Sequence, residues 1–262
     1  MRASGGDGVI DFQQLGKRYG DFEAVKGLDF SVARGELFGC LGPNGAGKTT
    51  TIRMMMGILV PSSGRVQIAG LDCHRERAEV QRHVGYLPDT PVFYDCLRGR
   101  EILQFVAEMH GFGRREAGVR ADRMLDEFAL RDEAQEYAVN YSLGMKKKLG
   151  LACALIHEPE VLILDEPING LDPRASRDVQ ERLRDLAARG CTVFVSTHLL
   201  DMAERLCSRI GIFHKGQLAA LGAPAEVKQR LKGAGQDASL EDAFLQITSA
   251  AAAEDDAQEP RP

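Results

Sequence analysis

The sequence predicts an α/β fold: a mostly parallel sheet at the core, an N-terminal antiparallel β subdomain and an inserted α-helical subdomain. Three observations lead to this prediction. Short, fully apolar runs alternate with helical patterns along much of the chain, as they do where a parallel sheet is buried. Early segments alternate apolar and polar residues, which is typical of half-buried antiparallel strands. Residues from about 90 to 159 show helical patterns and no strand signal, which indicates a helical insertion.

Length and composition are those of a globular protein. The chain has 262 residues, 44% hydrophobic and 27% charged, enough for one large domain or two small ones. Its net charge of −5 argues against nucleic acid as a partner. No apolar run approaches the ~20 residues that span a bilayer, and the N-terminus lacks the apolar core of a signal peptide. The six cysteines form no C-x-x-C pair, which predicts reduced thiols and a cytoplasmic protein without a structural metal or disulfides.

The first strands are expected at residues 10–19, with a turn at Gly16, and at residues 28–32. Tyr19 ends the first strand. An aromatic ring near a nucleotide can stack on adenine, while a tyrosine at a strand end can simply cover the edge of a sheet. Spacing alone leaves both interpretations of Tyr19 open.

The stretch that organises the chain is Gly-Pro-Asn-Gly-Ala-Gly-Lys-Thr-Thr at residues 42–50. It fits the pattern G-x-x-x-x-G-K-[ST] of the phosphate-binding P-loop. The apolar run 37–41 predicts a buried strand before it, and residues 49–58 predict a helix after it. A P-loop requires this position between a strand and a helix, whereas a glycine-rich turn that merely caps a helix does not. The core is therefore predicted to be a P-loop NTPase core.

The chemistry of this loop follows from its backbone. Glycines allow the chain to curl with its N–H groups pointing inward, and the helix N-terminus adds a positive dipole. Lys48 is expected to place a point charge on the β- and γ-phosphates, and Thr49 to offer its hydroxyl to Mg²⁺. The residues expected to bind the nucleotide here are Gly42, Pro43, Asn44, Gly45, Ala46, Gly47, Lys48, Thr49 and Thr50.

Two further strands, at 65–69 and 84–88, complete the first half of the chain, and Asp89 follows the second. The insertion then begins with a helix from Gly99. Its apolar positions fit one face, and a second helix is expected at 121–128. The residues assigned to that face are Ile102, Leu103, Phe105, Val106 and Met109.

The insertion ends in a helix to residue 157 that Ser142 is expected to cap. Three lysines, at 146–148, fall in its first turns, where the helix dipole disfavours cations. Such a broken local rule often marks a functional site. Consecutive helical residues lie about 100° apart, so at most one or two of these lysines face a single ligand and the others form a solvated face.

Residues 161–164 form a fully apolar run that predicts a central parallel strand, with Asp165 and Glu166 at its end. Proteins with α/β sheets bind ligands at this end of the strands. Asp165 is therefore expected to hold Mg²⁺, directly or through water, and Glu166 to orient or deprotonate the attacking water. The alternative is an acidic turn without a role in binding.

The last strand of the core is expected at 191–196 and leads to His198. A single histidine is usually structural, but this one follows a parallel strand and should share the ligand-bearing edge with Glu166. A helix at 175–188 precedes this strand, and a hairpin at 210–218 and two short helices, 225–231 and 240–247, follow it. Residues 250–262 are acidic and poor in bulky apolar residues, which predicts disorder.

Together these segments resemble the ATP-binding cassette (ABC) ATPases, the nucleotide-binding subunits of ABC transporters. Residues 42–50 match the Walker A motif, residues 161–166 the Walker B motif with its catalytic glutamate, and residues 169–172 the D-loop. His198 matches the switch histidine and Tyr19 the aromatic residue that stacks on adenine. The resemblance covers roughly residues 9–248, with 1–8 as a flexible lead, about 90–159 as the helical subdomain and 249–262 as a disordered tail.

The signature motif departs from the family pattern. Residues 141–145, Tyr-Ser-Leu-Gly-Met, stand where the family has Leu-Ser-Gly-Gly-Gln, so only Ser142 and Gly144 are kept. This form resembles the branch of type-2 ABC exporters, as does the sequence of residues 239–244. Asp89 stands where the family has Gln, or Glu in that branch, and would reach Mg²⁺ through water; otherwise it starts a turn. Ile168 replaces the usual Thr or Ser.

The resemblance implies an ATPase that uses ATP and Mg²⁺, with catalytic Glu166, His198 and Lys48. It implies a homodimer or paired cassette that sandwiches two ATP molecules, in which Ser142 and Gly144 of one subunit contact the γ-phosphate held by the other. The membrane partner would be a separate permease subunit contacted by the helical insertion, with this chain on the cytoplasmic face of the membrane. Two alternatives are a soluble ABC-type ATPase acting on ribosomes or DNA, and a nucleotide switch without turnover. The single cassette and acidic tail oppose the first, and Glu166 and His198 oppose the second.

Overall fold

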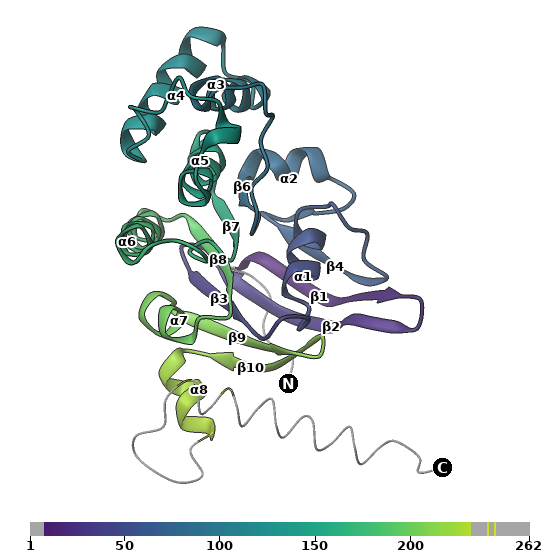
Figure 1. The fold of residues 1–262 in the computed structure, drawn as a ribbon. Helices are drawn as coiled ribbons and strands as arrows, with labels where there is room; N and C mark the ends of the chain where they lie inside the picture. Colours follow the sequence, from purple (N-terminus) through teal and green to yellow (C-terminus); the bar gives the residue numbers. More distant parts are fainter. Residues whose placement is uncertain (1–7, 232–239, 241–243, 245–262) are drawn as a thin grey trace.

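The computed structural model describes residues 8–231, 240 and 244. Most of the predicted lead, most of the predicted helix 240–247 and the whole acidic tail lie outside these residues. Within them, no helix is both long enough and apolar enough to cross a membrane. The described chain forms two sheets and a group of helices that projects from one of them (Figure 1).

The predicted parallel core is a six-stranded sheet of order β10-β9-β3-β8-β7-β6. Five strands run parallel and β10 alone is antiparallel to its neighbour. All residues of the three central strands are buried, which explains why those runs are apolar throughout. The strands are β3 (Leu37–Leu41), β6 (Val84–Leu87), β7 (Val161–Asp165), β8 (Thr192–Thr197), β9 (Arg209–His214) and β10 (Gln217–Gly222).

The second sheet is the predicted antiparallel subdomain, of order β2-β1-β4-β5. Gly16 does not form the expected turn, because it lies inside β1, where the pairing register with β2 and β4 shifts. The sheet extends its hydrophobic face toward the core, where Phe12, Phe30 and Phe38 stack ring on ring. The strands are β1 (Gly8–Tyr19), β2 (Phe22–Ala33), β4 (Ser63–Ile68) and β5 (Leu71–Asp72).

Helix α1 (Lys48–Met55), the helix of the P-loop, lies between the two sheets (Figure 1). Ile52, Met54 and Met55 are buried in the same apolar cluster as the aromatic rings of both sheets. Burial on both sides therefore fixes the direction of the helix whose N-terminus forms the phosphate site.

The helical insertion consists of α3 (Gly99–Met109), α4 (Arg114–Glu127), the 3-10 turn η1 (Ala138–Asn140) and α5 (Leu143–Leu155). In Figure 1, α3 and α4 lie at the top of the molecule and α5 leads down toward the parallel sheet. The prediction of a strand-free insertion is confirmed for the described residues. Helix α4 begins well before residue 121, and α5 ends before residue 157.

The apolar face predicted on α3 is buried only in part. Ile102 and Leu103 are buried, but Phe105 is 42% and Met109 72% exposed. Helix α3 packs mainly on α4 and α5, and its wide apolar surface exceeds the area that these two helices cover. Tyr94 stands edge-on to Phe105, with ring centroids 6.2 Å apart, and extends this exposed apolar surface.

The remaining helices surround the parallel sheet. Asp172 caps α6 by accepting hydrogen bonds from the N–H groups of Arg174 and Ala175, as its place before Pro173 predicts. Sequence patterns did not reveal α2 and α7, which are too short to show a helical period. The helices are α2 (Arg77–His83), α6 (Pro173–Ala188), α7 (Leu200–Leu206) and α8 (Pro224–Leu231).

Candidate nucleotide site

The loop between β3 and α1 curls as a phosphate-binding loop requires. Gly47 is the N-cap of α1 with φ of 100°, a conformation that a side chain would strain. A Cβ atom on Gly42 would lie 2.5 Å from the carbonyl oxygen of Phe213 on β9, so only glycine fits there. These two glycines fix the entry and the exit of the loop and leave the N-terminus of α1 open toward a ligand.

Lys48 lies across this loop with only 6% of its surface exposed. Its ammonium donates hydrogen bonds to the carbonyl oxygens of Gly42 at 2.6 Å and Pro43 at 3.2 Å. The same Nζ lies 3.7 Å from Oε1 of Glu166. A positive charge and a carboxylate thus face each other at the mouth of the loop.

Asp165 ends β7 and is held from two sides. Thr49 donates its hydroxyl to Oδ2 of Asp165 at 3.0 Å, and the hydroxyl of Ser196 donates to Oδ1. Ser196 occupies the equivalent end of β8, directly opposite Asp165 in the parallel register. The hydroxyl of the P-loop helix and the carboxylate of the central strand therefore meet, as their sequence positions predict.

Glu166 has a left-handed backbone, with φ of 48°, immediately after the strand. Its N–H group bonds to the carbonyl oxygen of Ser196 at 3.1 Å and to the hydroxyl at 3.2 Å. Nδ1 of His198 lies 3.0 Å from Oε2 of Glu166. The structure thus brings together Glu166, His198 and Lys48, which the sequence placed at one edge of the sheet.

Most of the predicted P-loop residues, with Tyr19, Asp89, Asp165 and Glu166, line one hollow of about 290 Å³. Tyr19 and Phe22, where β1 ends and β2 begins, line it beside the P-loop. Tyr19 is 48% exposed, and Nζ of Lys17 lies 5.3 Å from its ring centroid. Asp89 lines the same hollow as Asp165 and Glu166. Aromatic rings, loop amides and carboxylates in one hollow suit a nucleotide with its metal.

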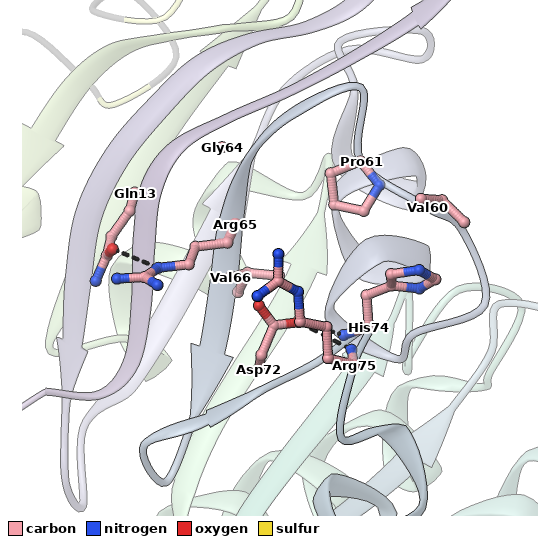
Figure 2. A pocket seen from close by; sticks show the side chains of 9 residues that line it. All are labelled: Gln13, Val60, Pro61, Gly64, Arg65, Val66, Asp72, His74 and Arg75. Carbon is pink, nitrogen blue, oxygen red and sulfur yellow. Dashed lines mark hydrogen bonds between the residues drawn. The ribbon is translucent and has the colours of Figure 1, made fainter.

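A second hollow, of about 490 Å³, lies on the antiparallel subdomain (Figure 2). Its polar groups bond largely to one another: Arg65 donates to Gln13 at 2.7 Å, and Asp72 accepts from the N–H groups of His74 and Arg75. None of the predicted site residues lines it. It is separate from the P-loop hollow.

Comparison with known proteins places this geometry in a family. The family model for ABC transporters matches residues 25–169, more than half of the chain. The chain belongs to the ABC transporter family. It is 41% identical to the daunorubicin resistance ATP-binding protein DrrA3 of Streptomyces coeruleorubidus, over 90% of this chain and 75% of that protein. The predicted family and the predicted ATP-binding cassette are therefore confirmed.

Two further comparisons agree with this assignment. The chain is 39% identical to the probable multidrug ABC transporter ATP-binding protein YbhF of Escherichia coli (strain K12), over 92% of this chain but 42% of that protein. It therefore spans less than half the length of this relative. A solved ATP-binding subunit of an ABC transporter superposes with a TM-score of 0.84 and 33% identity, covering 91% of this chain and 99% of that one. The α/β fold and the ATPase class are confirmed at the level of the family.

The signature motif of this ABC cassette lies apart from its own P-loop hollow. Ser142 caps α5 by accepting a hydrogen bond from the N–H of Met145 at 3.2 Å, as predicted, but neither Ser142 nor Gly144 lines the hollow. Leu143, which departs from the family pattern, packs on the D-loop: its Cδ2 lies 2.8 Å from where a Cβ of Gly170 would be. Leu143 thus packs against Gly170 of the same chain.

Besides Phe22, two residues that contact the site were not identified from the sequence. The Ser196 hydroxyl donates to the carboxylate of Asp165 and accepts from the backbone N–H of Glu166. Ser196 lies near the end of the strand next to β7, and this shared edge is the signal that could have found it. Lys147, one of the three lysines assigned mainly to a solvated face, is only 3% exposed. It donates to the carbonyl oxygen of Glu166 at 2.6 Å and lies 3.7 Å from Oδ1 of Asp89. Burial lowers the pKa of Lys147, and the nearby Asp89 and Glu166 oppose that shift.

Proposed function

We propose that this chain is the ATP-hydrolysing subunit of a membrane exporter and works with separate membrane-spanning subunits. The observation that carries the proposal is the cluster of Glu166, His198 and Lys48 at the mouth of the P-loop. A switch that only binds nucleotide has no need of a carboxylate paired with a histidine at the place where the γ-phosphate would lie. The presence of both groups favours turnover.

Each residue has a role in this proposal. The amides of residues 42–50 cradle the phosphates, and Lys48 turns from its loop carbonyls to the β- and γ-oxygens. Tyr19 stacks on the adenine with its open face. Glu166 orients and deprotonates the attacking water, and His198 holds the carboxylate and contacts the γ-phosphate.

Mg²⁺ fits the oxygen donors that line the hollow. Thr49 and Asp165 would hold it directly or through water, and Asp89 through water, together with the nucleotide phosphates. Within the described residues no three His, Cys, Asp or Glu side chains form a cluster able to hold a metal. One or two carboxylates with substrate phosphates are the usual arrangement for Mg²⁺. Bound there, it neutralises charge that develops on the phosphates.

A second copy, or a paired cassette, completes the site. Ser142 is exposed at the N-terminus of α5 and does not line the P-loop hollow of its own chain. The Ser142 hydroxyl and the Gly144 N–H can therefore donate to a nucleotide held by another subunit. Two chains related head to tail would then close over two ATP molecules. We place this dimer on the cytoplasmic face of the membrane.

The exposed apolar surface of the helical insertion supports a membrane-subunit partner. Val92, Tyr94, Phe105 and Met109 lie solvent-exposed on or beside α3. Single exposed apolar residues are normal, but several in one subdomain favour a protein contact. The names of DrrA3 and YbhF, with drug resistance and multidrug transport, favour export as the direction. No feature of the described residues favours ribosomes or DNA as the target.

ATP hydrolysis and export are tested separately. Purified protein should hydrolyse ATP with Mg²⁺ and lose turnover in EDTA. The chain is then co-expressed with the membrane protein encoded beside its gene, which should have about six apolar stretches of ~20 residues. Everted vesicles should show ATP-dependent uptake that Lys48→Ala abolishes. ATPase activity that co-sediments with ribosomes, and vesicles without uptake, would instead favour the soluble alternative.

A further inference from the structure

Lys147 joins three segments that are distant in the sequence. It belongs to α5, the helix that begins at the signature motif and is part of the helical insertion. Its Nζ contacts the carbonyl oxygen of Glu166, which follows β7 of the parallel sheet, at 2.6 Å. The same atom lies 3.7 Å from Asp89, in the connection between β6 and the insertion. One ammonium therefore bridges the insertion, the catalytic loop and the connecting segment.

The chemistry of this contact requires a cation with a long reach. An ammonium that is 3% exposed loses most of its hydration, so it persists only where acceptors and a counter-charge replace water. The Glu166 carbonyl supplies the acceptor and Asp89 the counter-charge. Lys146, one residue earlier, donates instead to the carbonyl of Val139 at 3.0 Å, within the insertion. The two neighbours thus differ in what they connect.

The bridge acts on the backbone that aims the Glu166 carboxylate. Glu166 has φ of 48°, and its N–H group is fixed by Ser196 from the core side. Lys147 fixes the carbonyl on the other side of the same residue. Since both peptide groups of Glu166 are held, a displacement of α5 changes the direction in which its side chain points.

We propose that Lys147 is a positioning residue that couples the signature helix of this chain to its own catalytic glutamate. The inference rests on the proposed ATP hydrolysis but not on export. When α5 moves with the insertion, the Glu166 carbonyl follows, so the carboxylate is aligned for water only in one arrangement of the insertion. A misplacement of about 1 Å is enough to cost a large part of a catalytic rate.

The test is a graded series at position 147 in the full chain. Lys147→Met keeps the length and removes the donor, and Lys147→Gln keeps a donor without the charge. We expect kcat to fall roughly 10- to 100-fold in the first and less in the second, with the affinity for a fluorescent ATP analogue within about twofold of wild type. Lys146→Met is the matched control and should keep wild-type kcat. If Lys147→Met does not fold, Lys147→Gln alone tests the inference.

A double-mutant cycle distinguishes positioning from general loosening of the fold. If Lys147 acts through Glu166, single-turnover hydrolysis in Glu166→Gln should change less than about threefold when Lys147→Met is added. Full additivity, a kcat within threefold of wild type in both variants, or a loss of ATP affinity equal to the loss of kcat would each overturn the inference. Wild-type protein without Mg²⁺-dependent turnover would contradict the proposed function itself, before any variant is compared.

Discussion

The two halves of the proposed site are built in different ways. The core half, with Asp165, Glu166 and His198, stands at the ends of adjacent parallel strands, and Asp165 belongs to their backbone ladder. The signature half, with Ser142 and Gly144, stands at the exposed start of a helix in the insertion. The first half is complete within one chain, whereas the second lies away from its own P-loop hollow. In the proposed function, the catalytic groups thus lie at strand ends, and the residues that would complete the site lie at the start of a helix.

Apolar side chains of the insertion and of the parallel sheet share one buried cluster, and polar contacts add to it. Besides Lys147, Arg182 of α6 donates to the carboxylate of Glu127 at the end of α4, at 2.9 Å, and to its carbonyl. The guanidinium also lies 4.2 Å from the ring centroid of Phe128. The Arg182 link is partly exposed, so it restrains the insertion less than strand pairing restrains the core.

The largest effect is expected in the core half. Glu166→Gln removes the base while keeping the size of the side chain, so turnover should fall by roughly 10²–10⁴ with ATP binding intact. The measurements are steady-state phosphate release and binding of a fluorescent ATP analogue. Steady-state turnover within threefold of wild type would show that Glu166 is not the base, and would remove the main distinction between the two halves.

The signature half should control association instead. In the Glu166→Gln background, ATP and Mg²⁺ should produce a dimer in size-exclusion chromatography, and Ser142→Arg should abolish it, because a long charged side chain then occupies the seam. ATPase in the otherwise wild-type chain should fall at least tenfold. Val119→Arg, on the exposed surface of α4, is the matched control. Strictly monomeric elution of Glu166→Gln at saturating ATP would show that ATP does not bring two chains together.

The same contrast explains what the sequence predicted well and what it did not. Parallel strands impose both an apolar pattern and a common edge, so the places of Asp165, Glu166 and His198 followed from local signals. Helical faces carry no such constraint: Phe105 and Met109 fit an apolar stripe but remain 42% and 72% exposed. Lys147 shows the converse, since its burial depends on an acceptor 19 residues away in another segment. Only tertiary structure supplies that partner.

An intermediate effect is expected where the halves meet. Asp89→Ala removes the counter-charge of Lys147 and one proposed metal contact at the entrance to the insertion. ATP affinity should change less than threefold, because the proposed phosphate ligands, the loop amides and Lys48, are unchanged, while ATPase stimulation by the membrane partner should fall about five- to tenfold. Asp132→Ala, an exposed carboxylate of the insertion, is the control. If Asp89→Ala keeps full ATPase stimulation by the membrane partner and full transport, Asp89 serves only as a turn residue.

The smallest effect concerns stability, and acid should loosen the insertion before the core. His157, just after α5, stacks on His110 at the end of α3 with ring centroids 3.7 Å apart. Burial, with smaller contributions from His110 and Arg120, lowers the pKa of His157 from 6.5 to about 4, against a weaker opposing hydrogen bond at Val84. Burial likewise lowers the pKa of His110. Both rings are therefore neutral in the folded protein near pH 7.

The sign of the pH effect follows from these directions. The unfolded chain binds a proton near pH 6.5 and the folded one only near pH 4, so stability is complete above about 6.5 and falls as the pH drops toward 4. The full shift corresponds to about 3 kcal/mol, and partial exposure of the ring reduces the expected loss to about 1–2 kcal/mol. Urea unfolding at pH 7 and 4.5 should show this loss in the wild type and a smaller one in His157→Gln. His74→Gln, on the exposed surface, should behave as wild type.

Hydrogen exchange shows where in the molecule the stability is lost. At pH 4.5, after correction for intrinsic rates, peptides from α3 and α5 should gain more exchange than those from β3 and β8. Equal gains in both sets of peptides would contradict the contrast between the halves.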